Sequence, residues 1–336
     1  MMKERIAILG GGCWGVTLAC HLYKKGYNSY IWEYDSDKAK LLDKKRRLVF
    51  LPGLEIPKKI FISYELSKIL KGKSVVIFAL PAKFFRSTVR KVAPLLDQNT
   101  KLIISATKGL ENITFKRMSE ILEEELPKRL HARIAVLSGP SHAEEVSVGI
   151  PTAVIVSAKN TKIALAAQKL FFKPTFRVYT NPDIIGVELG GALKNIYAIA
   201  CGVSDGLGLG DNTKAALVTR SLAEMSRFGV ELGAQLSTFF GLAGIGDLVV
   251  TCFSHWSRNR ALGEKIGQGE TVEHAAKEIK MTVEGLETTK AIHFLSRKMQ
   301  IEMPIANEVY SLLYENKKPQ QAMQDLLMRK AKSELQ

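Results

Sequence analysis

Short apolar runs alternate with helix-like patterns along the first half of the chain. The runs are rich in β-branched residues, which is typical of strands buried on both faces of a parallel sheet. A helix-like stretch over 15–25, closed by Gly26, separates the first two runs. The pattern therefore predicts an α/β fold with a doubly wound sheet. The predicted strands lie at 6–9, 29–32, 74–80, 102–105, 134–137 and 153–157.

The hydrophobic pattern changes near residue 185. Residues 178–183 look like the end of the α/β part, and beyond them the apolar spacing becomes helical, as at Leu217, Leu222 and Met225. A chain of 336 residues is long enough for two domains. We expect an N-terminal α/β domain over 1–185 and a mostly α-helical C-terminal domain over 186–336.

A glycine-rich loop follows the first predicted strand. The sequence 10–15, GGGCWG, matches GxGxxG and leads into a predicted helix, which is the context of a Rossmann-type dinucleotide site. Gly10 allows the tight turn, Gly12 admits a pyrophosphate, and Gly15 lets the helix pack close to the sheet. The N-terminal domain is therefore expected to bind a dinucleotide, with a plain glycine turn as the alternative.

The end of the second predicted strand bears on the choice of cofactor. Glu33 lies 18 residues after Gly15, near the spacing at which an acidic side chain binds the ribose hydroxyls and repels a 2′-phosphate. No arginine is nearby to hold such a phosphate. We expect a preference for NAD, with NADP still possible; the alternative is that Glu33 simply faces solvent.

Composition and charge limit the classes of molecule that this protein is expected to bind. The net charge of +15 fits an anionic substrate or dinucleotide, or a basic surface with no specific partner. The densest basic runs, 44–47 and 58–59, lack interleaved aromatic residues, so we expect no nucleic-acid binding. The longest apolar runs look strand-sized, as at 75–80, so no membrane insertion is expected.

The four cysteines form no CxxC pair, and no histidine stands at zinc-site spacing. We therefore expect no structural metal and no disulfide framework. Reduced thiols are typical of a cytoplasmic protein.

A lysine and an amide stand side by side in an apolar, small-residue stretch at 188–195. Burial there lowers the pKa of Lys194 toward the range that suits acid–base chemistry. A structural lysine whose ammonium group reaches solvent is the simpler alternative.

These residues belong to a longer pattern. ELGGALKN at 188–195, followed by GVSDGLGLGDNTKAAL at 202–217, resembles the signature of NAD(P)-dependent glycerol-3-phosphate dehydrogenases. Further motifs match in order, so the resemblance covers nearly the whole chain. It implies reduction of dihydroxyacetone phosphate to sn-glycerol 3-phosphate for glycerophospholipid synthesis, by a homodimer. The further motifs are GGGCWG at 10–15, SATKGLE at 105–111, LSGPSHAEEV at 137–146, GLAGIGDLVVTC at 241–252, SRNR at 257–260 and VEGLETTKA at 283–291.

The resemblance also assigns roles to single residues. It implies that Lys194 is the catalytic acid/base, that Lys108 is a second active-site lysine, and that Asp247 contacts substrate and orients the base. The substrate residues it implies are Lys108, Gly139, Ser141, Lys194, Asn195, Asp247, Thr251 and, around the phosphate, Ser257, Arg258 and Asn259. The cofactor residues are Gly10, Gly12, Cys13, Trp14, Gly15, Glu33, Tyr34, Lys108, Ala143, Arg258, Val283 and Glu284.

Simpler explanations exist for several of these residues. Lys108 could be a surface lysine at a strand end, Asp247 only a helix N-cap, and 257–259 only a polar turn. His142 is expected to pack rather than to react.

Two other functions stay open. A β-hydroxyacid dehydrogenase combines the same domains with a lysine base but acts on carboxylates, and the SRNR stretch argues against it. A dinucleotide sensor without catalysis would not need Lys108, Lys194 and Asp247 together. Cys13, Val16 and Thr17 depart from the family pattern without affecting chemistry, whereas Glu33 puts an NADP preference in doubt.

Overall fold

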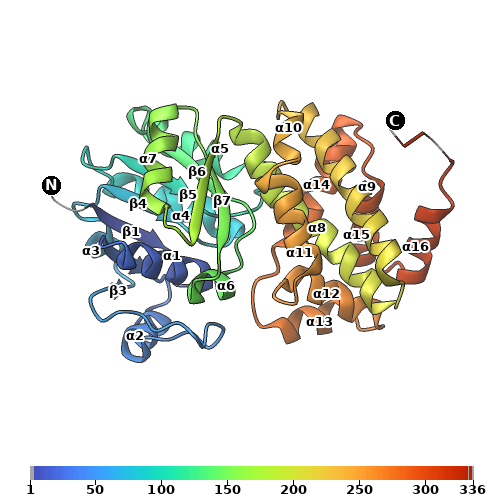
Figure 1. Ribbon diagram of the computed structural model, residues 1–336, viewed down its shortest axis with the longest axis horizontal. Helices are drawn as coiled ribbons and strands as arrows, with labels where there is room; N and C mark the ends of the chain where they lie inside the picture. The colour runs from blue at the N-terminus through green and yellow to red at the C-terminus, as the bar shows by residue number, and fades with distance from the viewer. Residues whose placement is uncertain (1–3, 332, 335–336) are drawn as a thin grey trace.

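A sheet with flanking helices and a separate group of helices form two lobes in the computed structural model (Figure 1). The structure describes residues 4–331 and 333–334. Residues 1–3, 332 and 335–336, which belong to the predicted domains 1–185 and 186–336, lie outside the described residues. The predicted α/β fold with a helical C-terminal part is confirmed.

Eight strands of the described chain form one sheet in the order β3-β2-β1-β4-β5-β6-β7-β8. All neighbouring pairs are parallel except β6 and β7. The strands are β1 (Arg5–Leu9), β2 (Asn28–Trp32), β3 (Phe61–Ser63), β4 (Val75–Phe78), β5 (Leu102–Ser105), β6 (Ile134–Ser138), β7 (Thr152–Ser157) and β8 (Phe176–Asn181).

The sequence predicted six of these strands to within about two residues and missed β3 and β8. β3 has only three residues, and in β8 the exposed Arg177 and Tyr179 alternate with buried Phe176 and Val178, so neither strand forms a continuous apolar run. The sheet is mostly parallel, with β6 and β7 as its antiparallel pair. The connection through the short helix α6 (Ala143–Val148) turns the chain back at the carboxyl end of β6, so β7 runs in the opposite direction.

Side chains of each central strand alternate between two apolar layers. In β1, Ile6 and Ile8 pack into one layer, and Ala7 and Leu9 into the other. The first layer is covered by α1 (Cys13–Lys24), α2 (Ser36–Lys45), α6 and α7 (Thr161–Phe171). The second is covered by α3 (Leu66–Leu70), α4 (Phe85–Val92) and α5 (Met118–Glu125), with short 3-10 turns at Ala82–Phe84, Ala93–Leu95 and Lys128–Arg133.

The helical lobe is built around α8 (Ile184–Gly206), which begins three residues after β8 ends. Helix α12 (Arg258–Gly267) packs directly against it. A Cβ on Gly202 would lie 2.0 Å from the Arg260 carbonyl oxygen, and one on Gly263 would lie 2.0 Å from that of Ile199. Only glycine permits this contact, which fixes α12 against the C-terminal half of α8.

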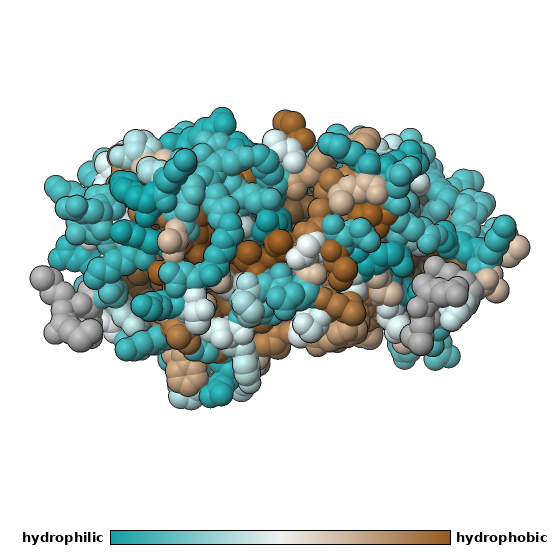
Figure 2. Space-filling view, turned by 90° about the horizontal axis from the view of Figure 1, so that it is seen from above, coloured by the Kyte–Doolittle hydropathy of each residue, from teal (hydrophilic) through white to brown (hydrophobic). Residues whose placement is uncertain are grey.

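The remaining helices surround this pair. They are α9 (Gly210–Glu231), α10 (Leu236–Phe239), a π-helical turn at Leu242–Gly246, α11 (Asp247–Phe253), α13 (Val272–Ile279), α14 (Glu284–Met299), α15 (Pro304–Tyr314) and α16 (Pro319–Leu327). Figure 2 shows hydrophobic side chains gathered midway along one face, where the two lobes meet, while the ends of the molecule are mainly hydrophilic.

The expectation that apolar runs are only strand-sized was wrong. α8 and the segment Leu236–Phe253 are both long and apolar enough to cross a membrane by length and composition. However, 89% of the apolar window in α8 is buried inside the protein, and the second segment consists of α10, the π-helical turn and α11. The length of α8 therefore reflects its place at the centre of a helical core.

Candidate active site

Two lysines from different parts of the fold share one buried carboxylate. Asp247, the first residue of α11, is fully buried. Its Oδ2 accepts from Lys108 Nζ at 2.6 Å, and its Oδ1 accepts from Lys194 Nζ. Lys108 lies in the loop after β5, and Lys194 lies in the middle of α8. The structure thus brings together the three residues predicted to be catalytic.

The protonation states of this group suit proton transfer. Burial lowers the pKa of Lys194 to about 7, helped by repulsion from Lys108 and opposed by Asp247. Burial opposes ionisation of Asp247, but attraction to the two ammonium groups prevails and lowers the pKa of this carboxyl. The predicted fall in the pKa of Lys194 is confirmed. A fixed negative charge therefore lies beside a proton that is labile near neutral pH.

Further contacts orient both lysines. Lys194 Nζ donates to Thr251 Oγ1 at 2.9 Å, one turn after Asp247 on α11. Lys108 Nζ donates to the Gly139 carbonyl at 2.9 Å, which also accepts from Ser141 Oγ at 2.9 Å. Gly139 has a φ of +101°, a conformation that favours glycine. The loop after β6 therefore directs the Gly139 carbonyl toward Lys108.

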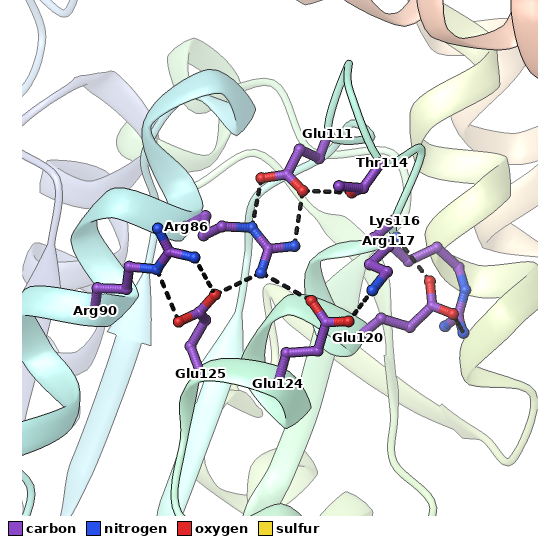
Figure 3. Close-up of polar contacts among 9 residues, drawn as sticks. All are labelled: Arg86, Arg90, Glu111, Thr114, Lys116, Arg117, Glu120, Glu124 and Glu125. Carbon is purple, nitrogen blue, oxygen red and sulfur yellow. Dashed lines mark hydrogen bonds and ion pairs between the residues drawn. The ribbon is translucent and has the colours of Figure 1, made fainter.

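A network of ion pairs holds the segment that carries Lys108 (Figure 3). Arg86 on α4 makes a two-pronged contact with Glu111, with both N–O distances 2.7 Å, and also binds Glu124 at 2.8 Å and Glu125 at 2.5 Å on α5. Arg90 makes a second two-pronged contact with Glu125. Because Glu111 is three residues after Lys108, Arg86 fixes this segment against the α/β lobe.

The same segment is also tied to the helical lobe. Glu188, buried on α8 six residues before Lys194, accepts from Arg117 Nη1 and from the backbone N–H of Ser119, both at 2.8 Å. Nearby, Asn112 donates to Glu287 on α14. Residues 106–119 therefore connect the two lobes beside the lysine pair.

Asn195, Asn259 and the start of α14 form a chain of hydrogen bonds next to the lysines. Asn259 Nδ2 donates to Asn195 Oδ1 at 2.9 Å, and Asn259 Oδ1 accepts from the Gly285 backbone N–H at 2.9 Å. Ser257 is the N-cap of α12, and its hydroxyl accepts from the Arg260 N–H at 3.2 Å. Arg258 is exposed, with one N–H donated to the Thr282 carbonyl at 3.0 Å. A helix N-terminus with an exposed arginine is chemically suited to an anion such as phosphate.

The glycine loop fits a dinucleotide pyrophosphate. Gly10 has a φ of +129°, and a Cβ there would lie 2.2 Å from the Ala79 carbonyl oxygen. A Cβ on Gly15 would lie 2.0 Å from the Gly10 carbonyl oxygen, whereas one on Gly12 would meet nothing within 4 Å. Gly12 caps α1 without a side-chain hydrogen bond, so the N-terminus of the helix faces open space. This is the geometry expected of a phosphate-binding turn.

The acidic end of β2 lies against this loop. Glu33 Oε1 accepts from the Asp35 N–H at 3.3 Å, and burial raises the pKa of Glu33 against the effect of hydrogen bonds from Asp35 and Gly11. Glu33 therefore does not simply face solvent. Tyr34 is 66% exposed, and its ring centroid lies 6.3 Å from that of Phe84.

Arg258 lies within electrostatic reach of both lobes. Burial raises the pKa of the Cys13 thiol on the glycine loop to about 11, with Arg258 opposing, so the thiol is neutral. Burial also raises the pKa of Glu284, the first residue of α14, to about 7, again with Arg258 opposing. The other residues predicted to bind cofactor are half-buried Trp14 on α1, Ala143 at the start of α6 and buried Val283, the N-cap of α14.

Two of the simpler explanations fail in the structure. Asp247 makes no capping bond, since Gly246 is the N-cap of α11 and the carboxylate binds the lysines. Lys108 is not a surface residue, because its side chain is 19% exposed and both of its acceptors are in the site. His142 lies near the Val250 carbonyl, and burial lowers its pKa to about 4. Reasoning from sequence missed the roles of Glu188, Arg117 and Arg86, because the bonds that hold the segment after Lys108 join residues 25 to 71 positions apart.

One group of potential metal ligands lies elsewhere in the described chain. Glu270, His274 and Glu278 converge on the surface of the helical lobe. Lys265 pairs with both carboxylates, at 3.0 Å with Glu270 and also with Glu278. The single positive charge of this lysine offsets one of the two carboxylate charges and occupies an oxygen of each.

Comparison with known proteins extends the likeness to the whole chain. Residues 5–164 match the model of the NAD-dependent glycerol-3-phosphate dehydrogenase N-terminus, and residues 183–324 match that of its C-terminus. The chain is 45% identical over 333 residues to a glycerol-3-phosphate dehydrogenase, NAD(P)+, of Fusobacterium nucleatum, covering 99% of both chains. A protein of the same name from Chlorobium phaeobacteroides is 46% identical over 332 residues, covering 98% of this chain and 99% of the relative.

A solved structure of a protein of the same name has the same fold as this chain. The crystal structure of glycerol-3-phosphate dehydrogenase from Coxiella burnetii superposes with a TM-score of 0.93 at 40% identity, over 97% of this chain and 99% of that one. The likeness therefore includes the relative arrangement of the two lobes.

Proposed function

The chain belongs to the NAD-dependent glycerol-3-phosphate dehydrogenase family, and on that premise we propose that it reduces dihydroxyacetone phosphate to sn-glycerol 3-phosphate with NADH or NADPH. The observation that carries the proposal is the buried carboxylate of Asp247 shared by Lys108 and Lys194. A bound reduced nicotinamide supplies the hydride in such a reaction. The residues of the chain bind the substrate, orient it and move the proton.

Lys194 is the proton donor in this proposal. As hydride reaches C2 of the substrate, its carbonyl oxygen gains negative charge and requires a proton. With a pKa of about 7, Lys194 can release a proton from Nζ near neutral pH and recover one from solvent afterwards. In the reverse direction the neutral amine accepts the proton of the substrate hydroxyl.

Asp247 and Lys108 support proton transfer by Lys194: the first positions its amine, and the second stabilises the charge that develops on the substrate. The carboxylate of Asp247 and the hydroxyl of Thr251 hold Lys194 Nζ in one position. Lys108 places a second positive charge beside the developing alkoxide, where few waters screen it. Gly139 and Ser141 contact the substrate from the loop after β6.

The substrate phosphate binds at the start of α12. Arg258 provides a fork of N–H donors, Ser257 and Asn259 provide a hydroxyl and an amide, and Asn195 holds Asn259 in position. This arrangement favours a phosphorylated ketone over the carboxylate substrate of a β-hydroxyacid dehydrogenase. The combination of two lysines with a carboxylate likewise favours an enzyme over a dinucleotide sensor.

The cofactor lies along the glycine loop in this proposal. Gly10, Gly12 and Gly15 admit the pyrophosphate beside Cys13 and Trp14, while Ala143, Lys108, Arg258, Val283 and Glu284 surround the nicotinamide half. Glu33 and Tyr34 meet the adenosine ribose, and the Glu33 carboxylate repels a 2′-phosphate, so NADH is preferred over NADPH. We further propose a cytoplasmic homodimer whose product supplies glycerophospholipid synthesis.

The test is the loss of reduced-nicotinamide absorbance with three substrates in parallel. The proposal predicts rapid loss with dihydroxyacetone phosphate, but at least ~10²-fold lower kcat/KM with unphosphorylated dihydroxyacetone, since charge-assisted phosphate contacts are lost. A β-keto acid should give no turnover. Turnover of the β-keto acid alone would indicate a β-hydroxyacid dehydrogenase, and NADH binding without any turnover would indicate a sensor.

Running the same assay with NADPH tests the cofactor preference separately. Faster loss with NADH supports the proposed effect of Glu33. Equal or faster loss with NADPH overturns that preference and leaves the reaction unchanged.

A further inference from the structure

A cavity that is open to solvent on one side lies in the helical lobe, away from the lysine pair. It has a volume of about 360 Å³ and is lined by residues of α8, α9, α15 and α16, helices that reach the end of the lobe farthest from the sheet (Figure 1). It begins at Ala200, six residues after Lys194 on α8, and reaches Ser204, about 15 Å along the helix from Lys194 at 1.5 Å per residue. None of the residues proposed above to bind substrate or cofactor lines it.

The walls of this cavity are aliphatic. No aromatic residue occurs among the described residues that line it. Such walls bury methylene groups well but offer no ring on which a planar heterocycle can stack. The shape and chemistry favour a flexible hydrocarbon chain. Apolar residues on its walls include Val203, Leu207, Leu217, Leu312, Met323 and Leu326.

The cavity also carries positive charge. Arg220, Arg227, Arg329 and Lys330 line it, against two carboxyl groups, Glu224 and Glu308. Arg329 is already paired with Glu302, whereas Arg220, Arg227 and Lys330 form no ion pair within the described part of the chain. The two carboxyl groups of the lining do not fully offset the remaining charge. Burial raises the pKa of Glu224 to about 7, while Glu308 pairs with Lys317 at 2.6 Å. The cavity is therefore complementary to an anionic head group.

One of the basic side chains has free hydrogen-bond donors at the cavity. Arg220 donates one of its five N–H groups, to the Glu334 carbonyl, and keeps others available within the described part of the chain.

We propose that this cavity binds a straight-chain aliphatic acid, with the chain between α8, α9, α15 and α16 and the head group at the arginines. The site does not depend on the proposed reaction, because binding can be measured directly. A carboxylate and a phosphate monoester share the required head-group chemistry, and both are included in the test.

The experiment is calorimetric titration of the full chain with dodecanoate, below the concentration at which it forms micelles. Dodecyl phosphate should bind within about tenfold of dodecanoate, whereas dodecyltrimethylammonium, with the same chain and opposite charge, should bind at least ~10-fold more weakly. Equal binding of the cationic amphiphile would overturn the proposal, because it would indicate nonspecific apolar adsorption.

Paired variants locate the binding. Ala216 is exposed on α9 and lines the cavity, so Ala216→Trp fills it, whereas Thr219→Trp alters the same helix outside it. Dodecanoate binding should be lost in the first variant and retained in the second, with dehydrogenase activity retained in both as evidence of folding. Arg220→Gln should weaken binding ~10-fold, the value of one charge-assisted contact, and Lys290→Gln on α14 should not.

Analytical sedimentation of the same proteins tests the alternative that a second copy of the chain, rather than a ligand, occupies this cavity. One outcome would be that wild type does not bind dodecanoate and that Ala216→Trp dissociates an oligomer. The cavity would then belong to a contact between copies of the chain, and the proposal of a ligand site would be wrong. Unchanged dodecanoate binding in Ala216→Trp would also contradict the proposal.

Discussion

Lys108 and Lys194 reach the same carboxylate from two regions that are built differently. Lys194 lies in the middle of a 23-residue helix that is buried for most of its length. Lys108 lies in a loop, and two ion pairs formed by residues that follow it, Arg86–Glu111 and Arg117–Glu188, hold this loop in place. Close packing fixes a side chain rigidly, whereas a loop held by ion pairs can yield without unfolding the lobe. This difference predicts that substitutions at or near Lys194 and those near Lys108 will affect catalysis in different ways.

The largest effect is expected from Lys194→Ala. The variant removes the proposed proton donor but leaves Asp247 paired with Lys108, so the fold should persist. Loss of a general acid should lower kcat by ~10³-fold, measured with dihydroxyacetone phosphate and NADH alongside circular dichroism. Lys290→Ala, an exposed lysine on α14, is the matched control. Activity within tenfold of wild type would rule out Lys194 as the acid.

Asp247→Asn should act on both lysines at once. The carboxylate raises the pKa of Lys194, so its removal lowers this pKa further and leaves two ammonium groups facing each other. We expect kcat for reduction to fall ~10²-fold. The pH above which reduction declines should move to lower values, since Lys194 loses its proton sooner. A decline at an unchanged or higher pH would contradict this coupling.

Arg86→Ala tests the loop alone. It removes the contacts with Glu111, Glu124 and Glu125 and frees the segment that carries Lys108. We expect kcat/KM to fall ~10-fold without a shift in the pH dependence set by Lys194. Arg90→Ala, on the same helix but 64% exposed, should change kcat/KM less than twofold.

Arg86→Lys should rescue little of this loss, because an ammonium group cannot reproduce the two-pronged contact with Glu111. Full rescue by lysine, or an equal effect of Arg90→Ala, would mean that the network contributes charge but does not position the loop.

At the cofactor end of the α/β lobe we expect an effect no larger than that of Arg86→Ala, and on the choice of cofactor only. Glu33→Ser should shift the ratio of kcat/KM for NADH over NADPH toward NADPH by ~10-fold, because it removes one ribose hydrogen bond and one charge. The KM for dihydroxyacetone phosphate should stay constant, since Glu33 is not among the residues proposed to bind that substrate. Asp37→Ser, an exposed acidic residue just beyond, controls for general surface charge.

Strong periodic signals in the sequence predicted the sheet and the motif residues well. β1, β4 and β5 are continuous apolar runs, and the glycines of 10–15 have the expected turn and close contacts. The short β3 and the half-exposed β8 lack such signals, and the apolar run of β7 predicts a strand but not its antiparallel direction. Their positions depend on how the chain turns in three dimensions.

The sequence predicted the reactive residues of the site, because each of them stands in a short motif that can be recognised on its own. Lys194 and Asp247 stand in recognisable motifs, so their roles could be proposed before their contact was known. Glu188 was part of the same motif, but its bond to Ser119 joins residues 69 positions apart. Arg86 and Glu111 lie in unrelated stretches. Ion pairs between distant segments leave no local pattern, and in this protein they hold the lobes beside the lysines.

The most direct test of the central claim is the pH dependence of kcat/KM measured in both directions. If one lysine with a pKa of about 7 transfers the proton, reduction of dihydroxyacetone phosphate requires it charged and should decline above about pH 7. Oxidation of glycerol 3-phosphate requires the same group neutral and should rise across the same interval. Parallel profiles in the two directions, or no inflection near neutral pH, would contradict the proposed role of Lys194.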